Sequence, residues 1–370
     1  MTSPHRRPAP RWPLRSLAVR ISIVVVAACG RDADRRPPRA PVERPDARDA
    51  APAPETATAG EVRDGLWFPA AEVIGEHVRV LAGPALRGRG SGTADEAAAA
   101  DKLAAWFRAA GLEAGGDDGG WLQPFDYGLD HKSQNVIGLV RGTRPGAGHV
   151  IVGAHYDHLG VLGGEIHPGA DDNASGAAAL VAIGRALTHD RQRPARTVVI
   201  VAFGAEEDGL HGSAHYAGHP RRPLAEATLM INLDMVGRSR FLSAAAYQLA
   251  HAIVADDAIG ALTSPGGHDL AALAKTAGER EQRPIVAASD FGPLEAMIRP
   301  TIEYRGDHKS FADRGVRYLW LSTSMHDDYH LPSDTADKVD PATIATVGRI
   351  VVRVIHALPA TTTSTPDAGP

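Results

Sequence analysis

The sequence predicts an α/β protein with three layers (α/β/α), in which helices cover both faces of a central mixed, mostly parallel sheet. Short, nearly continuous apolar and β-branched runs occur at residues 135–140, 149–154, 196–203, 228–233 and 317–322. Such runs are typical of strands buried on both faces. Helical stretches lie between several of them, notably at 174–188 and 341–357. This alternation of strands and helices indicates a largely parallel sheet covered on both sides.

The first 29 residues predict an export signal. Several arginines within residues 1–20 precede a short apolar run at 21–28, which stops at Cys29. A positive stretch, an apolar stretch and small residues before a break are typical of such signals. Residues 26–29 also resemble a bacterial lipobox, with an ordinary signal peptide or a short membrane anchor as the alternatives. We therefore expect export to the bacterial cell envelope as a lipoprotein anchored to the membrane at Cys29, or otherwise a periplasmic or secreted protein.

Composition predicts the domain organisation. Residues 30–62 are mostly proline, alanine, arginine and aspartate, which cannot repay the entropy of folding, and we expect a disordered linker. Residues 63–358 form the expected folded domain, which we expect to be monomeric, and 359–370 a disordered tail. The 370-residue chain has a net charge of −5, and no basic face in the folded part favours nucleic acid. Its single cysteine permits neither an intramolecular disulfide nor a thiolate zinc site.

The first element of the expected domain with a clear start signal is a helix at residues 93–111. Thr93 and Glu96 have the spacing of a capping box, Leu103, Trp106 and Phe107 follow at helical spacing, and Gly111 ends the stretch. We expect one face of this helix to pack on the core.

Polar clusters follow the predicted strands, where ligands of parallel sheets gather. His155 ends one strand, with Asp157 two residues later; His155 can be a metal ligand oriented through Asp157, or a hydrogen-bonded structural histidine. Asp171 and Asp172 lie in a small-residue loop that opens a helix, where helix capping is the alternative interpretation.

Three further clusters have the same placement. Glu206 and Glu207 belong to a run of three acids after the strand at 196–203. A shared cation would relieve their repulsion, although a solvated turn is the commoner explanation of an isolated acid run. Asp234 ends the strand at 228–233, and His330 lies in a His- and Asp-rich segment after the strand at 317–322. Together the clusters supply the mixed nitrogen and oxygen ligands that zinc accepts, with one carboxylate left to bridge two ions.

On these motifs, and on residues 86–93 and 306–311, the chain resembles the di-zinc peptidases of family M28, which include bacterial leucyl aminopeptidases, aminopeptidase Y and glutamate carboxypeptidase. The resemblance runs from about residue 74 to residue 356 and implies the zinc-exopeptidase fold. It implies that one zinc ion is held by His155 and Asp234, a second by Glu207 and His330, and that Asp171 bridges them. It further implies Glu206 as general base, Asp157 as the acid behind the ligands, and Tyr329 as a hydroxyl that polarises the scissile carbonyl.

The expected function is zinc-dependent release of N-terminal amino acids from peptides. Two zinc ions would activate a water molecule, and Glu206 would take its proton and pass it to the leaving amine. Two alternatives use the same scaffold, carboxypeptidase action and a glutaminyl cyclase-like reaction. A third alternative, a non-catalytic peptide-binding module, belongs to another class of protein. Residues 238–300 carry no signal that identifies the preferred side chain.

Overall fold

The computed structural model describes residues 59–359 apart from 190–192, 239–254, 256 and 324. The expected signal at 1–29, with Cys29, most of the linker and nearly all of the tail lie outside the described residues. The described chain opens with the hairpin of β1 (Gly60–Arg63) and β2 (Leu66–Pro69). Residues 60–62 are therefore a strand rather than the end of the linker. No helix within the described ranges has the length and apolar character required to span a membrane.

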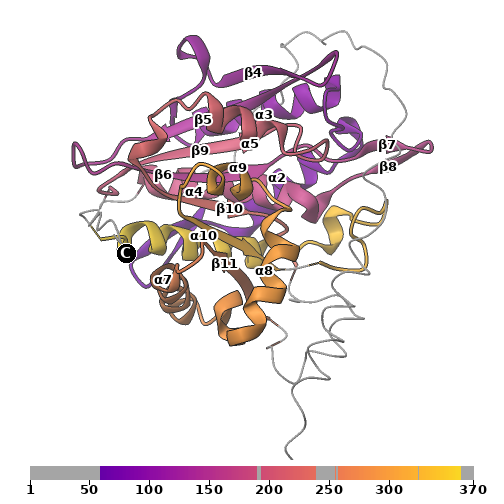
Figure 1. Ribbon diagram of the computed structural model, residues 1–370. Helices are drawn as coiled ribbons and strands as arrows, with labels where there is room; N and C mark the ends of the chain where they lie inside the picture. Colours follow the sequence, from indigo (N-terminus) through magenta and orange to yellow (C-terminus); the bar gives the residue numbers. More distant parts are fainter. Residues whose placement is uncertain (1–58, 190–192, 239–254, 256, 324, 360–370) are drawn as a thin grey trace, which may run out of the picture.

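A nine-stranded sheet forms the centre of the molecule (Figure 1). Its strand order is β12-β11-β13-β10-β6-β9-β5-β3, and β4 pairs with β5. The strands are β3 (Glu113–Ala114), β4 (Leu122–Tyr127), β5 (His131–Val140), β6 (His149–His155), β9 (Thr197–Phe203), β10 (Ala227–Leu233), β11 (Ile259–Thr263), β12 (Ile285–Ala287) and β13 (Tyr318–Ser322). The four central strands, β13, β10, β6 and β9, are parallel. A separate small hairpin joins β7 (Gly160–Leu162) to β8 (Glu165–His167).

Helices cover both faces of the sheet, so the predicted three-layer α/β/α architecture is confirmed. One face packs against α2 (Ala71–Leu81), α3 (Ala94–Ala109), α4 (Gly176–His189), α7 (His268–Arg280) and α10 (Pro341–Ala357). The other face packs against α5 (His211–Gly218) and α9 (His308–Ala312), with Tyr216 and Phe311 in its core, while α8 (Glu295–Glu303) lies near β11. Residues 176–187 of α4 are all buried, as an alanine- and leucine-rich helix without charged faces requires.

The predicted elements agree closely with the observed ones where the apolar pattern is continuous. The five predicted strands correspond to β5, β6, β9, β10 and β13, and the predicted helix at 341–357 is α10. Thr93 caps α3 as expected, because its side chain accepts a hydrogen bond from the Glu96 amide. The order of the parallel strands brings the carboxyl ends of β6, β9, β10 and β13 to one edge, and the loops that follow them meet there.

Candidate metal centre

The first group of metal-ligating side chains comes from the ends of β6 and β10 and from the loop before α4. His155 is the last residue of β6, and its Nε2 lies 3.4 Å from Asp172 Oδ1 and 3.6 Å from Asp234 Oδ1. Glu206 Oε2 is 3.9 Å from the same nitrogen. These residues are buried or nearly so. His155, Asp172 and Asp234 together form a cluster with one ligand atom each within reach of a single ion.

A second group lies on the other side of Asp172. His330 Nε2 is 3.2 Å from Asp172 Oδ2 and 3.4 Å from Glu207 Oε2. His158, Asp172 and Glu207 also have ligand atoms close enough to share an ion. Asp172 therefore presents Oδ1 to the first group and Oδ2 to the second. An arrangement in which one carboxylate faces two His-and-carboxylate sets is suited to a pair of metal ions.

The separations within each group match zinc coordination. Zinc binds His nitrogen and carboxylate oxygen at about 2.0–2.2 Å, so ligand atoms around a tetrahedral ion lie about 3.3–3.6 Å from one another. The contacts of His155 with Asp172 and Asp234 and of His330 with Asp172 and Glu207 span 3.2–3.6 Å. The residues present thus fit two zinc ions in the chemistry of their donors and in their spacing.

Asp171 does not lie between the two groups, contrary to the sequence-based prediction. Its Oδ1 accepts a hydrogen bond of 2.6 Å from the Gly237 amide, and its Oδ2 is 3.2 Å from His326 Nε2. Asp171 thereby holds the turn that follows Asp234. Neighbouring acids in this tight turn point in different directions, so the side chain that reaches the cluster is that of Asp172. The central position predicted for Asp171 is corrected to Asp172.

Asp157 supports the acidic turn after β9 more than it supports the His155 ring. Its Oδ1 and Oδ2 accept hydrogen bonds from the amides of Glu206 and Glu207, at 3.0 and 3.2 Å. Ser91 Oγ donates to Asp157 Oδ2 at 2.6 Å. The nearest contact of His155 Nδ1 is the Asp157 carbonyl oxygen, at 3.2 Å, while Oδ1 is 3.9 Å away. Asp157 therefore lies behind the ligands, as expected, but acts on the glutamates through their backbone.

Burial and the crowding of carboxylates set the electrostatics of the cluster. Burial raises the pKa of Glu206 well above its usual range, and Glu207, Asp307 and Asp234 add to this although His155 opposes it. Burial lowers the pKa of His155, but Glu206, Asp172 and Asp234 outweigh burial and raise it well above its usual value. Burial raises the pKa of Asp172, yet its contacts with His155 and His330 bring it well below its usual range. Such opposed shifts are typical of functional sites.

A family model described as Peptidase family M28 matches residues 135–355. The chain belongs to peptidase family M28. The matched region includes every residue of the two metal-ligating groups, from His155 to His330. The loops that bring these residues together are therefore part of the M28 domain.

Individual relatives support the same family. The M28 chain is 37% identical over 110 residues to aminopeptidase YwaD of Bacillus subtilis. The aligned region covers 29% of this chain and 22% of that protein. The chain thus spans about a fifth of the length of this curated relative. The structure of a zinc aminopeptidase from Bacillus subtilis is similar, with 16% identity and a TM-score of 0.55. The superposition covers 77% of this chain and 94% of that chain. The superposition with a glutaminyl cyclase from Porphyromonas gingivalis covers 77% of this chain and 97% of that chain, with 20% identity and a TM-score of 0.55. The last two show the fold.

Tyr329 lies beside the second group of the M28 site. Its ring stacks on that of His330, with 3.8 Å between the ring centroids. Burial raises the pKa of the Tyr329 hydroxyl well above its usual value, and Asp172 and Glu207 raise it further. The hydroxyl is therefore protonated at neutral pH and can donate a hydrogen bond. The stack also fixes the orientation of the His330 ring.

Arg89 is a supporting residue that the sequence alone did not single out. Its side chain is fully buried and donates to four carbonyl oxygens, those of Leu81, Tyr156, Pro168 and Gly169, at 2.7–2.8 Å. Two of these carbonyls flank the ligands, since Tyr156 follows His155 and Gly169 precedes the Asp172 loop. The guanidinium ties both loops together and brings positive charge beneath the carboxylates. Its place in a glycine-rich loop, 86–93, is the one sequence signal that pointed to it.

Glu96 and Asp334 are two further supporting residues that sequence reasoning missed. Glu96 Oε1 accepts from the Ala205 amide at 3.0 Å, which holds the turn before Glu206. Asp334 Oδ2 accepts from the amides of Asp171 and Asp172, at 2.9 and 3.1 Å. Glu96 has the capping-box spacing, and its Oε2 accepts locally from the Gly92 amide at 2.6 Å, but the sequence pattern does not reveal the second contact, with Ala205, more than a hundred residues away. Asp334 lies in the His330 segment, and no local pattern distinguishes it.

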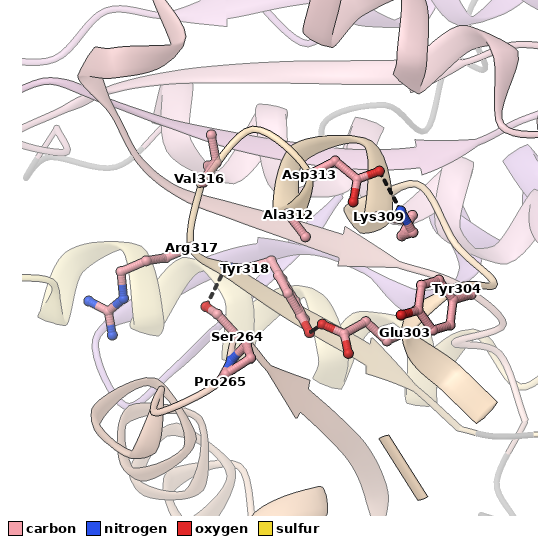
Figure 2. Close-up of a pocket in the computed structure, with 11 residues that line it drawn as sticks. Ser264, Pro265, Glu303, Tyr304, Lys309, Ala312, Asp313, Val316, Arg317 and Tyr318 are labelled. Carbon is pink, nitrogen blue, oxygen red and sulfur yellow. Dashed lines mark hydrogen bonds and ion pairs between the residues drawn. The ribbon is translucent and has the colours of Figure 1, made fainter. Parts of the chain in front are cut away.

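A cavity of about 320 Å³ lies away from this site. It is lined by residues next to the amino end of β13, including Ser264, Glu303 and Tyr318 (Figure 2). Two pairs of polar groups in its wall contact each other: Tyr318 donates to Glu303 at 2.8 Å, and Lys309 pairs with Asp313. No member of the two metal-ligating groups lines this cavity.

Proposed function

We propose that this chain is a two-zinc peptidase that releases amino acids from the N-terminus of peptides. The observation that carries the proposal is the position of Asp172, whose two oxygens face separate sets of ligands. His155 and Asp234 would hold one ion, and Glu207 and His330 the other. The aminopeptidase relatives support the choice of reaction among the activities open to this fold.

Glu206 is suited to carry a proton from the activated water molecule to the leaving nitrogen. Two zinc ions, when bound, supply Lewis-acid activation of a water molecule and of the peptide carbonyl. Glu206 lies 3.9 Å from His155 at the first group without belonging to either set of ligands. Burial raises the pKa of its carboxyl group, which favours accepting a proton at neutral pH and returning it to the leaving nitrogen. The Tyr329 hydroxyl can donate to the developing oxyanion from beside His330.

The predicted export and lipid anchoring at Cys29 extend this proposal to the cell envelope. The proposed two-zinc site would then face peptides outside the cytoplasm, and the residues that precede the domain would tether it to the membrane. Labelling of cells with a radioactive fatty acid should mark the full-length chain and not a Cys29→Ser variant.

The variant Glu206→Gln tests the proton transfer. We expect it to retain both zinc ions and to lose about 10²–10⁴-fold in kcat. Asp208→Asn is the matched control, because Asp208, the third acid of the run, accepts a hydrogen bond from Tyr127 instead of facing the ligands. It should keep activity within a few-fold of wild type. Full activity in metal-loaded Glu206→Gln protein would remove Glu206 from the mechanism.

The reaction class is tested with matched peptides whose N-terminus is free or acetylated, assayed with and without a chelator. We expect only free N-termini to be cleaved, and cleavage to stop when zinc is removed. Cleavage of acetylated peptides alone would contradict aminopeptidase action. Release of residues from the C-terminus, or cyclisation of an N-terminal glutamine, would establish one of the two other reactions on this scaffold.

A further inference from the structure

His158 is a buried histidine at the metal centre to which the mechanism above gives no task. It follows Asp157 after the end of β6, and its side chain is fully buried. Its Nδ1 is 2.8 Å from Glu207 Oε1 and 3.8 Å from Asp172 Oδ2. The ring thus lies on the second group, on the side of Glu207 opposite to the oxygen that His330 faces.

Distances distinguish His158 from the ligand histidines. His155 and His330 lie 3.2–3.6 Å from the carboxylate oxygens of their groups, as atoms that share a zinc ion do. The 2.8 Å contact of His158 with Glu207 is shorter than that and has the length of a hydrogen bond between an N–H group and a carboxylate. Its distance from Asp172 is longer than any of the ligand separations.

We propose that His158 is a positioning residue that donates a hydrogen bond from Nδ1 to Glu207 Oε1. Glu207 Oε2, which faces His330, is thereby left for the second metal ion. The inference rests on the proposed two-metal site, and it names the residue that orients one ligand of that site. A carboxylate with one oxygen held by a donor binds metal through the other oxygen in a fixed orientation, so less side-chain freedom is lost when the ion binds.

Packing holds the His158 ring in place for this role. A β-carbon at Gly169 would lie 2.4 Å from His158 Cγ, so only glycine leaves room for the ring. Gly169 also has a positive φ of 57°, which a residue with a side chain would adopt only with strain. The His158 amide donates to the Arg89 carbonyl oxygen at 3.1 Å. The two atoms lie within hydrogen-bond distance, at 2.8 Å, but the ring N–H direction and the carboxylate oxygen are not aligned as in an ideal hydrogen bond.

The segment after β6 therefore serves both groups. His155 faces the first group, Asp157 accepts from the Glu207 amide at 3.2 Å, and His158 contacts the Glu207 side chain. Glu207 is held at its backbone and at its carboxylate by two residues of one short segment. Loss of His158 should weaken the second ion without disturbing the first.

The test compares His158→Asn, which keeps an N–H donor near the position of Nδ1, with His158→Leu, which removes it. Stepwise zinc affinity of the full-length protein is measured by competition with a chromophoric chelator. We expect His158→Leu to bind the second ion about 10–100-fold more weakly and the first unchanged, while His158→Asn stays within a few-fold of wild type. His149→Leu, a buried histidine replaced at the other end of β6, is the control and should keep both affinities.

X-ray absorption at the zinc edge separates a donor from a ligand. Zinc-loaded wild-type protein and His158→Asn should show the same number of imidazole ligands. Loss of an imidazole in His158→Asn, with equal weakening in both variants, would make His158 a ligand and overturn the inference. Wild-type affinity in His158→Leu would also overturn it, leaving the proposed function intact. If the wild-type protein takes up fewer than two zinc ions, the proposed function falls and this inference falls with it.

Discussion

The two ends of β6 each carry a buried histidine, and the two have opposite electrostatic environments. His149 begins the strand and His155 ends it, and each is at most 2% exposed. Burial, with a smaller contribution from Arg222, lowers the pKa of His149 to about 4. At His155 burial also lowers the pKa, but the surrounding carboxylates raise it well above its usual value. Burial is common to both residues, so the carboxylates at the carboxyl ends of the strands make the difference.

The same contrast separates the amino ends of the central strands from their carboxyl ends. Near the amino end of β13, around the cavity of Figure 2, Tyr318 pairs with Glu303 and Lys309 with Asp313. At the carboxyl ends, Asp172, Glu207 and Asp234 gather around two histidines whose separations suit metal ions. The backbone there adopts left-handed conformations at Ala205 and Met235, and His330 has the same backbone conformation, with φ of 52–59°. Non-glycine residues in this region of φ cluster at functional sites.

The largest expected effect comes from removing the carboxylate shared by both groups. Asp172→Asn should lose both zinc ions and lower kcat/KM by about 10³-fold or more, because Lewis-acid activation contributes several kcal/mol. Asp171→Asn should bind both ions, with a modest loss of activity through the Gly237 turn. Mass spectrometry measures the metal content of the two variants, and steady-state kinetics measures their activity. The reverse ranking would restore Asp171 to the central position and contradict the geometry described above.

The next largest effect distinguishes the two histidines of β6. His155→Leu should lose the first zinc ion and nearly all activity. His149→Leu should keep both ions and kcat/KM within a few-fold of wild type, because its ring lies at the other end of the strand. Zinc titration and peptide hydrolysis are measured side by side. If His149→Leu lost metal as His155→Leu does, the contrast between the two ends of the strand would be broken.

How far the sequence predicts this molecule depends on whether the signal is local. The strands 149–155 and 197–203 are continuous apolar runs, so their existence and burial follow from hydrophobic patterning alone. No strand or helix is predicted within residues 238–300, yet they include β11, α7 and β12. The two strands are short, and short strands at a sheet edge depend on partners that lie far away in the sequence. Most of the predicted site residues do lie at strand ends, as parallel topology requires.

The exchange of Asp172 for Asp171 shows where sequence reasoning stops. Both are acids in the same loop, and which one faces the cluster depends on backbone torsions and on distant partners. Asp334 fixes both amides from another part of the chain, and the Gly237 amide draws Asp171 away. Arg89 was missed for a similar reason, since all its acceptors are backbone carbonyls that no sequence pattern marks.

The smallest expected effect is a pH dependence of stability that belongs to the amino end of β6. Because the folded-state pKa of His149 is lowered to about 4 from an unfolded value of about 6.5, the unfolded chain binds more protons between these values. The free energy of unfolding should therefore be fully retained above pH 6.5 and fall as the pH decreases toward 4, by about 1–3 kcal/mol for this residue.

His77 and His308, whose pKa values are lowered by burial to about 4 and about 3, would add to the same trend, so the contribution of His149 is isolated by difference. Denaturant unfolding of metal-free wild type and His149→Leu at pH 7 and pH 5 should show the smaller pH effect in the variant. Identical pH effects in both proteins would mean that His149 is charged or solvated in the folded state. The two ends of β6 would then differ less than their surroundings indicate.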